Sequence, residues 1–187
     1  MSRSPKLLFL FCIYLLLSSE QAIADPLSDA KREFESGNYV EAARLFLPLA
    51  ENGDAFSRFK LAVMYRKGQG VQQDYKEALK WNRLAAEQGF AKAQNNLGTM
   101  YCRGDGVTQD YKEAVKWYRL AAEQGYDIAQ YNLGRMYDEG LGVPRDIVEA
   151  KNWYKKAAQQ GHRDAKSNFE YLDRDENILS PDDAESV

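Results

Sequence analysis

The chain has 187 residues, 28% of them charged, and a formal net charge of −3. This length suits one domain. The mixed, slightly acidic charge lacks the basic stripe that favours binding to nucleic acid or adsorption to an anionic membrane. We therefore expect neither nucleic acid nor a membrane surface as a partner.

Residues 1–24 are typical of a secretory signal peptide. Arg3 and Lys6 give a positive start, an apolar run of eleven residues covers 7–17, and Ala22–Ala24 has the small-x-small cleavage pattern. The apolar run is too short to cross a hydrocarbon core of about 30 Å. Cleavage after Ala24 and a periplasmic or secreted mature chain without membrane insertion are predicted. An uncleaved anchor is the alternative.

Residues 25–52 are predicted to form a helical hairpin that caps the chain at its N-terminal end. Tyr39 and Ala42 lie 36 residues before Tyr75 and Ala78, so the second helix of this hairpin keeps the register of the units that follow. Its turn is shorter than theirs, and the spacing resembles the tetratricopeptide pattern. An atypical terminal unit of this kind is what a stacked array needs as its cap.

Three units of 36 residues follow, over 53–88, 89–124 and 125–160. A fixed period of this size is typical of a solenoid of stacked supersecondary units. In the first half of each unit, apolar residues recur at helical spacing up to a Gly-x-Gly-Val turn, and small residues at Ala62, Gly98 and Gly134 imply close helix–helix approach.

The second half of each unit is predicted to be a helix that begins after an aspartate. Alanine, tryptophan and alanine follow at i, i+3 and i+7, which places them on one helical face with a small-large-small relief. The predicted N-caps are Asp74, Asp110 and Asp146, and the stripes are Ala78-Trp81-Ala85, Ala114-Trp117-Ala121 and Ala150-Trp153-Ala157.

The C-terminal part is predicted to contain one closing helix over 161–173, with Ala165, Phe169 and Leu172 facing back toward the array. Residues 174–187 are rich in aspartate and glutamate, with one arginine, and we expect this acidic tail to be disordered.

The pattern L-G-x-x-Y-x-x-G-x-G-V-x-x-D, then A-x-x-W-x-x-x-A-A-x-x-G, resembles the Sel1-like repeat family, relatives of the tetratricopeptide repeats. Ala62 replaces the glycine in the first unit and Ile147 the tyrosine in the third. The resemblance implies an all-α fold, an α/α solenoid wound as a right-handed superhelix of antiparallel helix pairs. It also implies adaptor or scaffold work. Some secreted members are described as β-lactamase-like, but they resemble a subtype with paired cysteines, so that activity is not carried over.

The sequence offers little material for catalysis. His162 is the single histidine, it takes the place of Phe90 and Tyr126, and no second histidine or cysteine completes a metal site. We expect its ring to pack rather than to bind a ligand. Cys102 has no histidine near it in sequence, which favours a spare thiol over a nucleophile. The prediction is a chain that is not an enzyme and that holds no metal or cofactor.

The candidate partner-binding residues lie where the first halves of the units differ. A repeat scaffold keeps its core and turns and leaves exposed positions free to suit a partner. Spacing of four and three residues puts each unit's three positions on one helical face, along the expected concave wall. The candidates are Phe59, Val63, Arg66, Asn95, Thr99, Cys102, Tyr131, Arg135 and Asp138. The alternative is a tolerant solvent face, with Phe59 partly covered by the neighbouring helix.

The predicted function is protein–protein interaction, with a protein or peptide segment of unknown identity held on the concave face, in the bacterial envelope or outside the cell. Two other hypotheses stay open. One is a hydrolase acting on envelope material such as peptidoglycan or β-lactams, which would need a cluster of titratable groups that the sequence lacks. The other is a structural oligomer joined by a disulfide between copies of Cys102.

Overall fold

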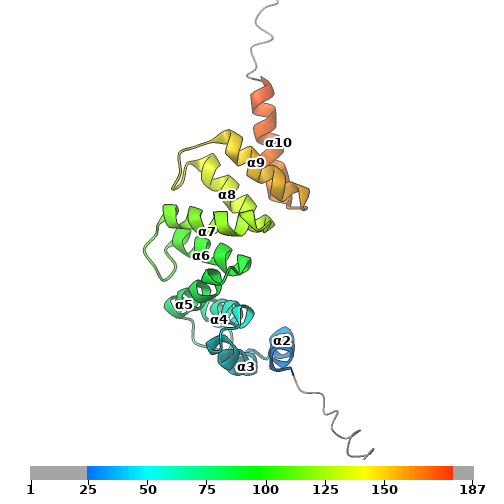
Figure 1. Ribbon diagram of the computed structural model, residues 1–187. Helices are drawn as coiled ribbons and strands as arrows, with labels where there is room; N and C mark the ends of the chain where they lie inside the picture. The colour runs from blue at the N-terminus through cyan, green and yellow to red at the C-terminus, as the bar shows by residue number, and fades with distance from the viewer. Residues whose placement is uncertain (1–24, 179–187) are drawn as a thin grey trace, which may run out of the picture.

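The computed structural model describes residues 25–178, and this part of the chain is all helical. The helices are α2 (Pro26–Glu35), α3 (Tyr39–Glu51), α4 (Ala55–Lys67), α5 (Tyr75–Glu87), α6 (Ala91–Arg103), α7 (Tyr111–Glu123), α8 (Asp127–Glu139), α9 (Ile147–Gln159) and α10 (Arg163–Ile178). Each packs mainly against its neighbours in sequence, which gives an elongated stack with α2 and α3 at one end and α10 at the other (Figure 1). The predicted all-α solenoid is confirmed. The signal-peptide prediction lies outside the described residues, as does the tail prediction for 179–187.

The closing helix α10 is longer than expected. It was predicted to end at 173, but residues 174–178, assigned to the tail, continue the helix to Ile178. Nothing in this stretch breaks a helix, because the next glycine or proline is Pro181. Ala165 and Leu172 are buried and Phe169 packs beside them, so the helix does face back toward α9.

The aspartates before the second helices are N-caps, as predicted. An Asp110 carboxylate oxygen accepts hydrogen bonds from the backbone N–H groups of Lys112 and Glu113 at 2.9 and 3.1 Å. Asp74 caps α5 in the same way, and Asp146 accepts one bond from the backbone of Glu149. These bonds satisfy donors that the first turn of a helix leaves without an intrahelical partner.

The second glycine of each Gly-x-Gly turn is required by contact between units. A Cβ added at Gly106 would lie 2.4 Å from the carbonyl oxygen of Tyr75, the first residue of α5 in the preceding unit. The residue also has a φ of +72°. The turn therefore rests directly on the backbone of the preceding unit, and a side chain there would push two units apart.

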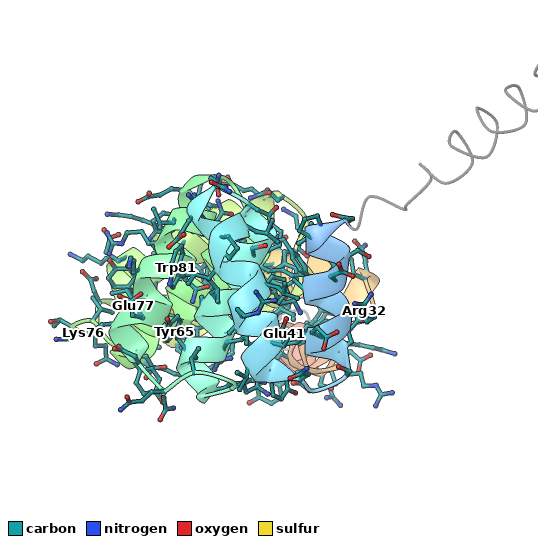
Figure 2. The ribbon with its side chains drawn as sticks, turned by 90° about the horizontal axis from the view of Figure 1, so that it is seen from below. Arg32, Glu41, Tyr65, Lys76, Glu77 and Trp81 are labelled. Atoms are coloured by element: carbon teal, nitrogen blue, oxygen red, sulfur yellow. The ribbon has the colours of Figure 1, made fainter. Side chains whose placement is uncertain are left out.

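The predicted inner stripe of the second helices forms the core. Ala114 and Ala121 are fully buried, and Trp81 and Trp153 keep only 6 and 7% exposure. Figure 2 looks from below the view of Figure 1 and shows Lys76 and Glu77 at the outer edge, with Trp81 further in. Trp117, the tryptophan of the middle stripe, is only half-buried.

Close helix–helix approach at the small position of the first helices is also confirmed. A Cβ at Gly98 would lie 2.8 Å from the ring of Tyr118 on α7 and 3.1 Å from the Ala114 carbonyl oxygen. Gly134 stands in the same relation to Tyr154. In the first unit the two equivalent positions hold Ala62 and Asn82. A glycine thus accompanies a tyrosine ring, and an alanine accompanies the smaller asparagine.

Candidate functional site

The nine predicted residues lie on the first helices of the three units, α4, α6 and α8. We call the exposed and half-buried side chains of these three helices the first-helix face. Neighbouring first helices contact one another across the unit boundaries: Phe59 packs against Phe90 with ring centroids 5.4 Å apart, and Asn132 donates a hydrogen bond to Asn95 at 2.9 Å. The three helices therefore present one continuous surface.

Tyr131, one of the predicted contact residues, belongs to the packing between units. The Tyr131 ring is stacked on His162, with centroids 4.5 Å apart and ring planes 22° apart, and lies 5.8 Å from the Tyr154 ring. The prediction that His162 packs its ring is confirmed. Its Nδ1 also accepts a hydrogen bond from the backbone N–H of Ala165 at 3.3 Å, at the start of α10. Within residues 25–178, no group of three or more His, Cys, Asp or Glu residues could hold a metal ion.

Asn95 was expected to be exposed, but it is buried. Its side chain is 7% exposed, because it is held between first helices by the hydrogen bond from Asn132. Thr99, half-buried, donates to the Asn95 carbonyl oxygen at 3.1 Å and accepts from the Tyr118 hydroxyl at 3.1 Å. Burial of that hydroxyl raises the pKa of Tyr118 to about 12, so the tyrosine stays protonated and donates the bond.

Cys102 is half-buried on the same face. Burial raises the pKa of its thiol, and the guanidinium groups of Arg135 and Arg103 oppose the rise only in part. A thiol with a raised pKa is largely protonated at neutral pH and is a poor nucleophile, which favours the spare-thiol interpretation.

Arg135 is the most accessible of the nine residues, since it alone of them is classed as exposed. It donates to Glu139 one turn along α8, at 3.0 Å from Nε and 2.7 Å from Nη2. Asp138 is half-buried and accepts from the Tyr154 hydroxyl at 3.3 Å. Val63 and Arg66 are half-buried as well. The exposed part of the predicted site is therefore smaller than expected.

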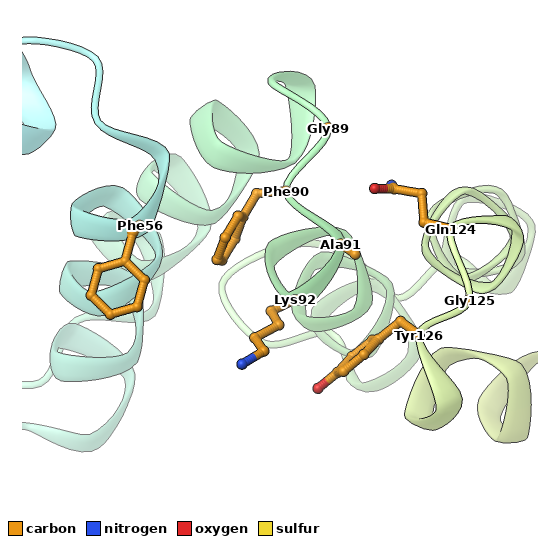
Figure 3. A pocket seen from close by; sticks show the side chains of 8 residues that line it. All are labelled: Phe56, Gly89, Phe90, Ala91, Lys92, Gln124, Gly125 and Tyr126. Atoms are coloured by element: carbon orange, nitrogen blue, oxygen red, sulfur yellow. The ribbon is translucent and has the colours of Figure 1, made fainter. Parts of the chain in front are cut away.

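An open pocket of about 590 Å³ lies at the N-terminal ends of the first helices, where the sequence prediction had not placed one. Phe56, Phe90 and Tyr126 supply aromatic walls, and the Lys92 side chain extends between Phe56 and Tyr126 (Figure 3). A signal for it exists in the sequence. Position 56 and its equivalents 92 and 128 hold Phe, Lys and Ile, which is as variable as the positions that were chosen.

The family model of the Sel1 repeat matches residues 55–90, 91–126 and 127–162, more than half of the chain. The chain belongs to the Sel1 repeat family. The matched units begin at the first helix, two residues later than the boundaries predicted from the glycines.

Solved Sel1 structures agree with this assignment. The chain is similar to a Sel1 repeat protein from Oxalobacter formigenes, with 35% identity and a TM-score of 0.72 over 75% of this chain and 58% of that one. It is also similar to c5321, a protective antigen present in uropathogenic Escherichia coli strains displaying an SLR fold. That match has 39% identity and a TM-score of 0.69 over 78% of this chain and 36% of that one. The Sel1 chain thus spans less than two thirds of either relative.

Helicobacter pylori cysteine rich protein B matches with 22% identity and a TM-score of 0.52, over 74% of this chain and 93% of that one. At this identity the likeness concerns the fold alone. A comparison with curated proteins gives no match. No helix within residues 25–178 is long and apolar enough to cross a membrane.

Proposed function

We propose that this Sel1 repeat chain is a non-catalytic scaffold that binds a segment of another protein on its first-helix face. The observation that supports this most is an asymmetry between the first and second helices of units one and two. The second helices of units one and two, α5 and α7, differ at two of their 13 positions, whereas the first helices, α4 and α6, differ at nine of 13.

The residues that α4 and α6 share are those of the core. Leu61 and Leu97 are buried, as are Met64 and Met100. Five of the nine differences fall on the first-helix face, for example Val63 against Thr99, whereas Ser57 against Ala93 and Ala62 against Gly98 are buried. Divergence of α4 from α6 while α5 and α7 stay alike is suited to recognising a partner through the first helices of these two units. Between units two and three both kinds of helix diverge about equally, at six of 13 positions for α6 and α8 and at seven of 13 for α7 and α9.

The titratable groups on the first-helix face and directly beneath it also favour binding over catalysis. Burial raises the pKa values of Cys102, Tyr118 and Tyr154, so these groups stay protonated and serve packing or hydrogen bonding. The signal-peptide pattern of residues 1–24 supports a place in the bacterial envelope or outside the cell, and this location is part of the proposal.

The test is a photo-crosslinking scan in the cells that produce the chain. Benzoylphenylalanine is placed at positions 63, 99 and 135 of the first-helix face, and at the exposed positions 76 and 112 of the second helices as matched controls. We expect the first three to crosslink the same partner segment, as identified by mass spectrometry, and the controls to give no adduct. Adducts from the second helices alone would contradict the proposal.

A further inference from the structure

Three lysine ammonium groups gather at the N-terminal end of the stack. Lys60 of α4 has its Nζ 4.1 Å from the ring centroid of Phe34 and 5.2 Å from that of Phe56. Lys31 of α2 has its Nζ 4.7 Å from the same Phe56 centroid. Lys92 of α6 extends toward Phe56 from the other side of the pocket (Figure 3). Within the described residues none of these lysines forms a salt bridge.

The lysines act on one another electrostatically. Burial lowers the pKa of Lys60 most, and repulsion from Lys92 and Lys31 lowers it further, while the Glu35 carboxylate opposes these effects in part. Positive charge is therefore concentrated here on a chain whose net charge is −3. A negative group bound at this point would relieve the repulsion between the ammonium groups.

The pocket beside the lysines offers apolar contact. Phe56 and Phe90 meet edge to face, with centroids 6.5 Å apart, and Tyr126 lines the pocket with them. Its volume of about 590 Å³ is enough for a large side chain. Cationic and aromatic side chains thus lie next to each other at the N-terminal end of the first-helix face and on the adjoining helix α2.

We propose that the cluster of Lys31, Lys60 and Lys92, together with this pocket, docks an acidic segment of a partner protein. Carboxylates of the segment pair with Lys60 and Lys92, and a neighbouring aromatic or aliphatic side chain enters between Phe56, Phe90 and Tyr126. This inference rests on the proposed scaffold function and adds to it the position and the chemistry of the ligand.

Other polyanions fit the site less well. Nucleic acid requires a basic face or stripe, and lipid recognition by charge uses clusters of about four to eight basic residues. Here three lysines stand on a chain with more acidic than basic residues. A few carboxylates flanking one apolar side chain match the number of cations and the single pocket.

Fluorescence anisotropy with two synthetic peptides tests the inference on the purified protein. One labelled peptide alternates glutamate with phenylalanine and leucine, and the other has glutamine in place of each glutamate. We expect the acidic peptide to bind at least about tenfold more tightly, because a charge-assisted contact to a carboxylate contributes roughly that factor. Raised salt should weaken the binding.

Two substitutions of exposed lysines, each with the same change in charge, distinguish a local contact at the lysine cluster from a general effect of the chain's net charge. Lys92→Glu alters the cluster and Lys112→Glu alters the second helix α7. We expect Lys92→Glu to weaken binding of the acidic peptide by about tenfold or more, and Lys112→Glu to change it by less than about twofold. Lys60→Gln should weaken binding as well, with melting curves confirming that each variant is folded.

Equal binding of the two peptides, or equal losses from Lys92→Glu and Lys112→Glu, would overturn the inference. The scaffold function would survive that result, since the crosslinking scan does not depend on these lysines. The chain's own acidic tail is a different occupant. If neutralising Asp182, Asp183 and Glu185 tightens peptide binding and abolishes self-association in sedimentation, the ligand is the tail of a second copy and the partner-protein inference is wrong.

Discussion

The two helices of a Sel1 unit diverge to different extents between the first two units of this chain. The second helices bury the alanine and tryptophan stripe and are almost identical in the first two units, whereas the first helices keep only a few core residues in common. Both kinds of helix contribute to the core, so burial alone does not explain why α4 and α6 differ at more positions than α5 and α7. Under the proposed scaffold function, this difference reflects recognition by the first helices and a shared packing role of the second helices in these two units.

The largest loss of stability should follow from removing a buried tryptophan of a second helix. Trp153→Ala removes a side chain that is 7% exposed and that shares a core cluster with Ala129 and Leu133 of α8. We expect a loss of about 3–5 kcal/mol in urea unfolding. Trp117→Ala is the matched control and should cost less, because Trp117 is half-buried. Equal losses in the free energy of unfolding would mean that the difference in burial between the two tryptophans does not affect stability.

The glycine of a first helix should be the next most sensitive position. Gly98→Ala brings a Cβ within 2.8 Å of the Tyr118 ring, and overpacking of this kind costs about 1–3 kcal/mol. Adding Tyr118→Asn recreates the pair found at Ala62 and Asn82 in the first unit. The double variant should therefore lose less stability than the sum of the two single variants. Strict additivity in urea unfolding would contradict the pairing of a glycine with a tyrosine ring.

A smaller loss is expected at the helix cap. Asp110→Ala removes the acceptor for two backbone N–H groups of α7 and should cost about 1 kcal/mol. Asp110→Asn keeps an acceptor oxygen and should retain most of the stability, as measured by thermal unfolding. A loss as large from asparagine as from alanine would show that the negative charge at the helix N-terminus matters more than the hydrogen bonds.

The smallest effect on stability should come from the first-helix face. Arg135→Ala removes an exposed pair with Glu139 and should change the free energy of unfolding by less than about 0.5 kcal/mol. The same substitution should reduce crosslinking of the partner from position 99. A stable variant that crosslinks as well as the unsubstituted chain would remove Arg135 from the binding surface.

Much of the fold could be predicted because it repeats. The period of 36 residues placed the helices of the three units, and Asp110 and its equivalents defined where the second helices begin. Gly98 indicated that α6 and α7 pack closely. The end of α10 was missed because residues 174–178 are acidic but contain no helix breaker.

Less of the candidate site could be predicted, because it depends on contacts between units. Variation at Asn95 suggested exposure, but its side chain is held by Asn132 of the next unit. The lysine cluster was missed for a related reason. Lys31 belongs to the capping hairpin, whose shorter turn breaks the period, so only packing of α2 near α4 brings it to Phe56.

Exchanging helices between units tests most directly whether the first helices, rather than the second, bind the partner. In one variant, residues 91–103 replace 55–67, with Asn82→Tyr to keep the packing pair. In the other, residues 111–123 replace 75–87, with Ala62→Gly. Both should unfold near the midpoint of the original chain. Crosslinking from position 135 should be lost in the first variant and kept in the second. Loss in the second variant and retention in the first would contradict the claim that the first helices recognise the partner.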